Sequence, residues 1–412
     1  MGAAQRFKDA GFTALIALAL AFPLLGFQTT DTGDGYITRF NWVAIATAAA
    51  FVVRLLLSLV PQRFRLHQYA TRYTAIPQGK IIALLAGAMI LFAVLLPISP
   101  LGSRRTIDLA TLALIYVILG WGLNIVVGLA GLLDLGYVAF YAVGAYSFAL
   151  AAQWYGLTFW EMLPIAGLIA SAAGFLLGLP VLRLRGDYLA IVTLGFGEIV
   201  RIVLNNWSPV TGGPNGIGDI PRPTVFGMPI SPGAPEGMTT FNHFFGIAYD
   251  PLQRLIWLYY VCLAAALVIN WFSLRIRRLP VGRAWEALRE DEIACRALGL
   301  NPHTIKLTAF ATGAMIGGFA GAMFAAKQGF ISPESFNFQE SATVLSIVVL
   351  GGMGSQLGVA IAAVILATLP EFGREFAQYR MLFFGAAMVA IMIWRPRGLF
   401  TVRAPSVRLD RP

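Results

Sequence analysis

Residues 282–302, GRAWEALREDEIACRALGLNP, form a dense polar stretch in a chain that is otherwise mostly apolar. Long hydrophobic runs flank this stretch on both sides. Acidic and basic side chains mixed on one helix suit recognition by a soluble protein rather than contact with lipid. Seven charged residues lie within it: Arg283, Glu286, Arg289, Glu290, Asp291, Glu292 and Arg296.

Start and stop signals predict one helix over 282–299. Pro280 and Gly282 stand at its beginning, and Gly299 and Pro302 follow its end. Two interpretations remain open. The helix is either a solvated loop helix without a partner, or a docking helix whose apolar face and charges fit a cleft in a cytoplasmic protein.

The spacing within this helix also predicts which side chains face one another. Glu292 and Arg296 are four apart, and Glu286 and Arg289 are three apart, which favours ion pairs along an exposed helix. One face collects the larger apolar side chains and a thiol: Trp285, Leu288, Cys295 and Leu298.

Other chemistry is scarce in this sequence. The two cysteines and three histidines have no spacing suited to a disulfide framework or a metal site. Gly79–Lys80 is followed by Ile81, so no phosphate-binding loop is present, and the glycine-rich 211–221 lacks the lysine that such a loop needs. We therefore expect no catalytic residue, metal or cofactor of its own, and a chain that is not an enzyme.

Composition predicts an all-α, polytopic helical membrane protein. Hydrophobic residues make up 58% of the chain and charged residues 12%, whereas soluble domains carry about 25% charged residues. About ten or eleven hydrophobic segments approach the length that spans a bilayer. The net charge of +10 fits basic loops retained in the cytoplasm rather than a nucleic-acid partner.

Basic residues in the connectors give an orientation. Connectors 61–80, 183–187 and 273–306 and both termini are expected in the cytoplasm, and 28–40 and 205–253 outside. The pair Arg104–Arg105 falls on the outer side against this rule.

Three domains are predicted from these patterns. Residues 1–100 form an N-terminal extension with about three membrane segments and the loop 61–80. Residues 101–400 form the transmembrane core with the cytoplasmic helix 282–299, and 401–412 form a cytoplasmic tail.

Two apolar stretches, 120–147 and 341–369, are interrupted by glycines. Broken segments at corresponding places in two halves point to a transport site, although glycine is also common where membrane helices pack closely. The second stretch is either one long tilted span or a hairpin, and orientation favours the hairpin. Candidate residues of a translocation pathway are Asn124, Asp134, Glu198, Gly351, Gly352 and Gly354.

Two of these candidates also have structural interpretations. Asp134 could cap a helix near the inner surface. Glu198 stands three residues before Arg201, and the two could neutralise each other as an ion pair within the core.

The stretch GRAWEALREDEIACRALGLNPHTIKLTAFATGAMIGGFAGAMFA resembles the coupling region of branched-chain amino-acid ABC importer permeases of the LivM type. The resemblance spans roughly 105–400 through LRGDYLAIVTLGFGEIVRIVLNN, TGGPNGI, ESATVLSIVVLGGMGSQLG and WRPRGLF. The first hundred residues resemble the extra region of the longer, high-affinity members.

This resemblance implies a helix that inserts into an ATPase subunit and transmits ATP-driven closure to the membrane helices. Gly299 corresponds to the glycine of the importer pattern, but Ile293 stands in the place of its glutamate. The resemblance therefore implies that a nearby acid, Glu292 or Glu290, fills the role of that glutamate. Residues implied in ATPase coupling are Glu286, Arg289, Glu290, Asp291, Glu292, Arg296 and Gly299.

The same resemblance implies a set of partners and a place in the cell. The partners are a second homologous permease, two cytoplasmic ATPases that bind the ATP, a periplasmic or extracellular amino-acid-binding protein, and membrane lipid. The place is the bacterial inner membrane, and the substrates are leucine, isoleucine and valine. Urea or short amides are an alternative substrate class, and an ion-coupled secondary transporter is a further alternative that would need more unpaired charges in the spans.

Overall fold

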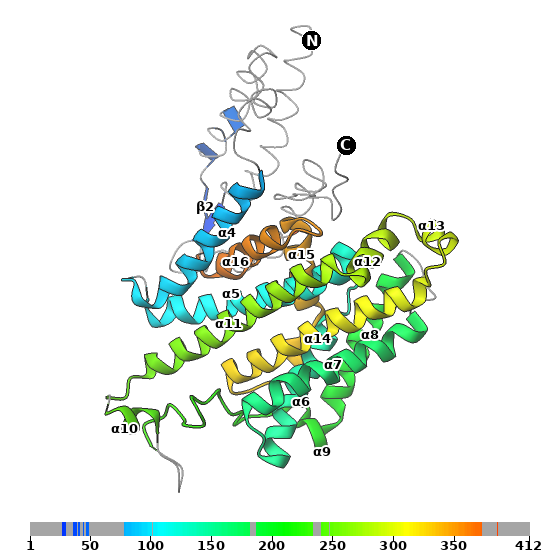
Figure 1. Cartoon of the computed structure of the whole chain (residues 1–412). Coiled ribbons are helices and arrows are strands. Elements are labelled where there is room, and N and C mark those ends of the chain that lie inside the picture. Colours follow the sequence, from blue (N-terminus) through cyan, green and yellow to red (C-terminus); the bar gives the residue numbers. More distant parts are fainter. Residues whose placement is uncertain are drawn as a thin grey trace. The chain divides into compact units, whose positions relative to one another are not determined.

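The computed structural model describes residues 27–29, 36–38, 40–41, 44, 47–48, 78–100, 102–181, 187–233, 240–246, 248–372 and 385 (Figure 1). The chain divides into two units, Met1–Leu85 and Ala86–Pro412. In the first unit, strand β1 (Phe27–Thr29) pairs antiparallel with β2 (Tyr36–Thr38). The sequence did not predict this short pair.

Several sequence predictions lie wholly or largely outside the described residues. They are the apolar runs 11–27, 41–60 and 380–394, the loop 61–80 and the tail 401–412.

Helices dominate the described residues of the second unit. Helix α4 (Gln78–Leu95) contains the boundary between the units. The first half of the second unit continues with η2 (Leu96–Ile98), α5 (Arg104–Leu123), the π-helical η3 (Asn124–Leu129), α6 (Val138–Tyr155), α7 (Phe159–Val181), α8 (Asp187–Asn206), α9 (Ser208–Thr211) and η4 (Gly213–Asn215). Its second half contains α10 (Phe241–Phe245), α11 (Pro251–Arg278), α12 (Pro280–Glu290), α13 (Glu292–Ala297), α14 (Pro302–Gln328), η5 (Pro333–Phe336), α15 (Phe338–Gly351) and α16 (Gln356–Phe372).

The expected fold class, an all-α membrane protein, is confirmed by these helices. Five helical segments in the described part are long and apolar enough to cross a membrane: Arg104–Leu129, Phe159–Pro180, Tyr188–Asn206, Pro251–Arg278 and Pro302–Gln328. Three shorter apolar helices accompany them: Leu84–Ile98, Phe338–Gly351 and Gln356–Thr368.

Polar side chains next to the helix starts explain where several of these helices begin. Ser103 accepts a hydrogen bond from the Thr106 N–H at 3.3 Å, and Asp250 accepts one from the Leu252 N–H at 2.8 Å. Asn301 and Asn337 cap α14 and α15 in the same way. Such caps satisfy backbone N–H groups that the first turn of a helix leaves without partners.

Helices α5 and α14 form the centre of the second unit. The apolar windows of their spans are 83% and 78% buried, against 28–39% for α7, α8 and α11. Figure 1 shows α14 running beside α7, and α14 also packs on α6 and α5. Gly144 of α6 and Gly318 of α14 meet backbone to backbone, where any side chain would collide. Small residues at such crossings let membrane helices approach closely.

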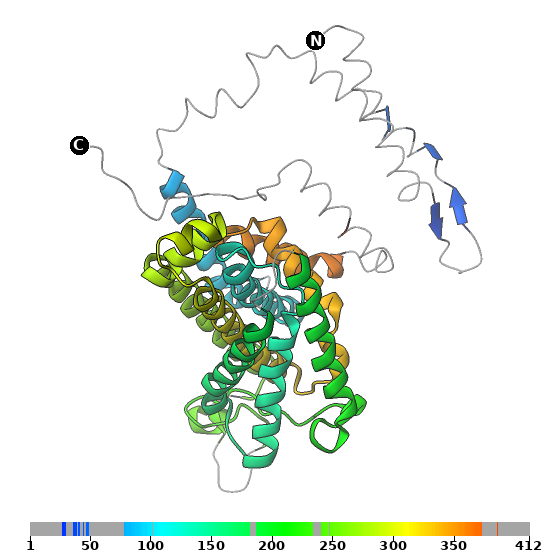
Figure 2. The same cartoon turned by 90° about the vertical axis from the view of Figure 1, so that its right-hand side faces the viewer.

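The two ends of the bundle hold different features. One end carries α12 and α13, and the other carries α9 and α10, as both views show (Figures 1 and 2). The second end is tied together by two hydrogen bonds between Ile217 and Ile331, of 2.8 and 2.9 Å, and by a 2.9 Å ion pair between Lys327 and Asp108.

Candidate functional site

The polar stretch forms two helices, so the prediction of a single helix over 282–299 is wrong. The break falls at Asp291, whose backbone is extended, with φ −158° and ψ 112°. Its Oδ1 accepts hydrogen bonds from the N–H groups of Ile293 at 2.7 Å and Ala294 at 3.1 Å. Aspartate competes in this way for the donors of a helix start, which ends α12 and begins α13. Gly299, with φ +77°, follows the end of α13.

The apolar face of this stretch packs into the protein, which corrects its interpretation as a docking face. Trp285, Leu288 and Cys295 are all buried. The Trp285 Nε1–H donates to the Thr308 hydroxyl of α14 at 3.1 Å. Leu298 does not share this environment, because it is 80% exposed. The buried face therefore anchors α12 and α13 to α14.

The charged residues form ion pairs, one predicted and others not. Glu292 pairs with Arg296 at 2.6 Å, as its spacing predicts, and also with the buried Lys306 of α14 at 3.0 Å. Glu286, predicted to face Arg289, accepts a bond from Arg277 of α11 at 2.5 Å. Two of the expected coupling acids therefore link α12 and α13 to the membrane helices.

Arg289 reaches from α12 to the break within the first glycine-interrupted segment. Its Nη1–H donates to the Gly128 carbonyl of η3. The stem of the side chain lies on Gly131, where an added Cβ would stand 2.8 Å from the Arg289 Cγ. Carbonyls at the end of a helix lack intrahelical partners and carry partial negative charge, which favours a cation there.

The second glycine-broken segment contacts η3 as well, through Gly354. Helices α15 and α16 pack against each other and are joined by residues 352–355, in which Gly352 and Gly354 have φ values of +101° and +88°. This arrangement confirms the hairpin and excludes the single tilted span.

Backbone groups of Gly354 bind partners from two other elements. Its N–H donates to the Asn124 Oδ1 at 2.8 Å, and its carbonyl accepts a bond from Arg277 Nη1 at 3.4 Å. The structure thus brings together residues that the sequence placed in two separate groups. Arg277 was missed, because nothing in the sequence distinguishes it from the neighbouring Arg275 and Arg278.

Asp134, the other candidate in the first broken segment, lies between η3 and α6. Its side chain is buried, and its Oδ1 accepts from the Gly136 N–H at 2.9 Å, which makes a local turn before α6. Tyr137, not Asp134, is the N-cap of α6. Burial raises the pKa of Asp134 from 3.8 to about 6, against the lowering effect of bonds from Gly136 and Thr193.

The raised pKa of Asp134 gives an expected pH dependence of stability. The folded chain holds this proton more tightly than the unfolded chain, so protonation favours folding. This contribution is complete below the unfolded value of 3.8 and is lost as the pH rises through about 6. We expect the thermal unfolding midpoint to fall between about pH 4 and pH 7, and to fall less in Asp134→Asn. The control is Asp219→Asn, at an exposed loop position. An unchanged pH profile in Asp134→Asn would refute this account.

Glu198 does not belong to the core of this chain. It pairs with Arg201 on α8, as its spacing predicts, but both side chains are partly exposed. Asn124, in contrast, is fully buried. Helix α8 is the least buried of the five long spans, which leaves Glu198 at the periphery of this chain.

Comparison with known proteins identifies relatives over nearly the whole chain. Residues 105–392 match the model of the family described as branched-chain amino acid transport system / permease component, and residues 5–96 match a domain of unknown function.

Two curated relatives are high-affinity branched-chain amino acid transport system permease proteins LivM. The protein of Escherichia coli K12 is 55% identical over 96% of each chain, and that of Salmonella typhimurium LT2 is 51% identical over 97% of this chain and 95% of its own. The permease protein LivH of the same system in S. typhimurium is 25% identical over 70% of this chain and 92% of its own. No solved structure matches the chain.

Proposed function

Since this chain belongs to the permease components of branched-chain amino acid transport systems, we propose that its α12–α13 element couples transport to ATP hydrolysis on separate subunits. The chain is a multi-pass membrane permease subunit of a branched-chain amino acid ABC importer. The family match does not favour urea, short amides or ion-coupled secondary transport.

The proposed assembly contains this chain, a homologous second permease, two ATPase subunits and an amino-acid-binding protein. The second permease is supported by LivM and LivH relatives that carry the name of one transport system. The clustering of Arg275, Arg277, Arg278 and Arg283 around the end of α11 supports a cytoplasmic position for α12 and α13 in the inner membrane. In this orientation both termini are also cytoplasmic, and the chain needs no ATPase site of its own.

One observation carries the coupling proposal. The guanidinium groups of Arg277 and Arg289 bind backbone carbonyls of Gly354 and Gly128, and these carbonyls belong to the two broken segments. Arg289 belongs to α12, and Arg277 of α11 is paired with Glu286 of α12. A displacement of α12 by the ATPases would therefore move the inner end of η3 through Arg289, and the turn of the α15–α16 hairpin through Glu286 and Arg277. In secondary transporters, backbone groups at helix breaks commonly form the transport site. Asn124 joins the two breaks directly.

Two side chains of α13 and the turn after it suit contact with the ATPase. Ile293 and Leu298 are 75% and 80% exposed. Ile293 lies between the charged residues Glu292 and Arg296 of α13, and Leu298 follows the helix. Exposed apolar side chains on a helix can insert into a hydrophobic groove of a partner. Reversal of the neighbouring acids is a poorer test, since Asp291 starts α13 and Glu292 pairs with Lys306.

The double variant Ile293→Asp/Leu298→Asp is expected to lose the ATPase subunits on purification. Each substitution places a charge where an apolar contact is proposed, and full burial of an Ile or Leu side chain contributes about 1.5–3 kcal/mol. The measurement is the ATPase content of the purified complex and its ligand-stimulated hydrolysis. The control is Phe226→Asp, at a 93% exposed position in the segment between η4 and α10. Retention of the ATPases with normal stimulation in the double variant would exclude these contacts.

A further inference from the structure

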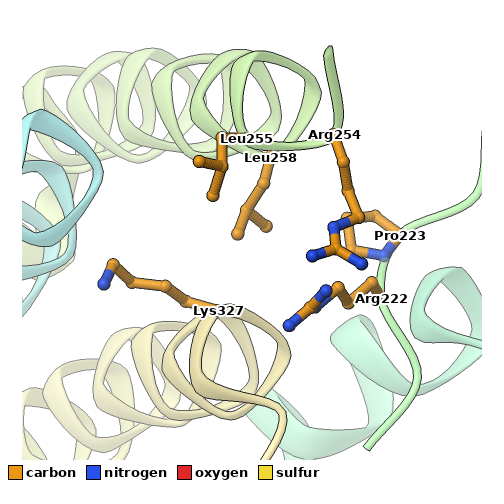
Figure 3. A pocket seen from close by; sticks show the side chains of 6 residues that line it. All are labelled: Arg222, Pro223, Arg254, Leu255, Leu258 and Lys327. Atoms are coloured by element: carbon orange, nitrogen blue, oxygen red, sulfur yellow. The ribbon is translucent and has the colours of Figure 1, made fainter. Parts of the chain in front are cut away.

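A small pocket with three cations lies at the end of the bundle opposite α12. Arg222, Arg254 and Lys327 line it together with Pro223, Leu255 and Leu258 (Figure 3). Arg254 is in the first turn of α11, and Lys327 is in the last turn of α14. Helix α12 follows the other end of α11 and contacts the beginning of α14 through Trp285. In the orientation proposed above, the pocket therefore opens at the outer face.

Of the three cationic side chains, Lys327 has an acidic partner outside the pocket lining. Lys327 extends toward α5, where it pairs with Asp108 at 2.9 Å. Arg222 and Arg254 direct their guanidinium groups into the gap between α11 and α14. The Arg254 Nε is buried and lacks a hydrogen-bond partner among the described residues. None of the described residues that line the pocket is acidic.

The lowered pKa of Arg222 also indicates that the described lining of the pocket lacks a negative charge. Burial, and next the positive charge of Arg254, lower the pKa of Arg222. A partly buried guanidinium beside another cation costs free energy that an anion between them would recover. The two arginines are therefore arranged for a negative group that this chain does not supply within the described residues lining the pocket.

Hydrogen bonds hold the backbone of the segment that carries Arg222 in place without a ligand. The Trp257 Nε1–H of α11 donates to the Pro223 carbonyl at 3.1 Å, and the Trp160 Nε1–H of α7 donates to the Thr224 carbonyl at 2.9 Å. The Ile220 N–H donates to the Gly329 carbonyl beyond α14 at 3.2 Å. A backbone segment fixed in this way loses little conformational freedom when the pocket binds a ligand.

The small volume of the pocket and its two guanidinium groups favour a single small anionic group as the ligand. Its cavity volume is about 20 Å³, enough for a water or for the end of one small group. Two guanidinium groups match the paired oxygens of a carboxylate. We propose that this pocket binds a single carboxylate group presented from the outer face. The carboxylate comes either from a free amino acid or from an Asp or Glu side chain of a protein that docks there.

The test compares Arg222→Gln/Arg254→Gln with wild type in the full transport complex. The matched control is Arg104→Gln/Arg105→Gln, which removes two charges from the exposed start of α5 at the same end. Both are reconstituted in nanodiscs of neutral phosphatidylcholine. One arm measures binding of L-leucine against leucinamide, which lacks the carboxylate. The other arm measures binding of the purified amino-acid-binding protein.

The pocket variant is expected to weaken binding about tenfold or more in at least one arm, with the control unchanged. Loss in the leucine arm assigns the carboxylate to a free amino acid, and loss confined to the protein arm assigns it to an acidic side chain. Arg254→Lys retains the charge but not the planar guanidinium group, so its binding affinity is expected to lie between those of the wild type and the double variant. This variant replaces the double variant in the test if the double variant does not fold.

Two outcomes would overturn the proposal. One is unchanged binding in both arms. The other is an effect that appears only when phosphatidylglycerol replaces phosphatidylcholine, because a lipid phosphate would then occupy the pocket. Neither outcome bears on ATPase retention through Ile293 and Leu298, so failure here is distinguishable from failure of the coupling proposal.

Discussion

Replacement of Arg289 by Ala is expected to lower leucine uptake about tenfold to a hundredfold per folded complex. The side chain leaves α12 and binds the Gly128 carbonyl, so its loss detaches the coupling element from the end of η3. A hydrogen bond to a charged group contributes about 1.5–3 kcal/mol, which corresponds to this range of rates if the contact is needed for coupling. The proposed partner contacts at Ile293 and Leu298 remain in place.

The decisive measurement for Arg289→Ala separates hydrolysis from transport. Basal ATP hydrolysis is expected to persist, while its stimulation by ligand-loaded binding protein and the uptake of leucine fall together. Arg283→Ala, at an exposed position on the same helix, is the control for loss of a cation. Arg289→Lys is expected to restore part of the coupling, since it retains a donor and the charge. Normal stimulation in Arg289→Ala would show that the contact with Gly128 is only structural.

Replacement of Gly351 by Leu is expected to prevent correct packing of the α15–α16 hairpin. A Cβ at position 351 would stand 2.6 Å from the carbonyl carbon and oxygen of Gly358 and from the Cα of Val359. Favourable carbon contacts need about 3.5–4.0 Å. These obstacles are backbone atoms, so relief requires the two helices to separate. We expect a loss of more than about 3 kcal/mol of stability, at the upper end of the cost of overpacking.

The thermal unfolding midpoint and the yield of monodisperse protein after solubilisation report this loss. The control is Gly195→Leu on α8, where an added Cβ meets nothing within 4 Å. A better helix former at an open helical position gains up to about 1 kcal/mol, so this variant is expected to be as stable as the wild type or more. Equal stability of the 351 and 195 variants would contradict the packing observed between Gly351 and Gly358. This stability test does not address whether Gly351, Gly352 and Gly354 line the translocation pathway. That prediction needs measurements of leucine uptake by variants that still fold.

The sequence predicted the features that depend on neighbours along the chain. An apolar run of sufficient length is helical within a bilayer, because the bilayer leaves backbone groups no partner except their own helix. The run 341–369 follows this rule as two helices rather than as one span. Gly299 and Pro302 mark the end of α13 and the beginning of α14, as their backbone preferences require. The ion pair between Glu292 and Arg296 follows from a spacing of four on one helix.

The break at Asp291 was also present in the sequence but was not recognised. Asp291 precedes Glu292 and a run of helix formers, which is a start signal. The good helix formers on both sides outweighed this signal in the prediction. The apolar pattern of Trp285, Leu288 and Cys295 likewise indicated a buried face without indicating whether this chain or a partner covers it.

By itself, then, the sequence determined the class of the protein, the five long spans among the described residues, the polar element between two of them and the family resemblance. Only the tertiary structure decided which residues that element touches. Arg289 meets a carbonyl 161 positions away, and Asn124 meets a backbone N–H 230 positions away. The physical reason is that such contacts depend on how α5, α12 and the hairpin pack in space, and backbone acceptors such as Gly128 carry no side-chain signature in the sequence.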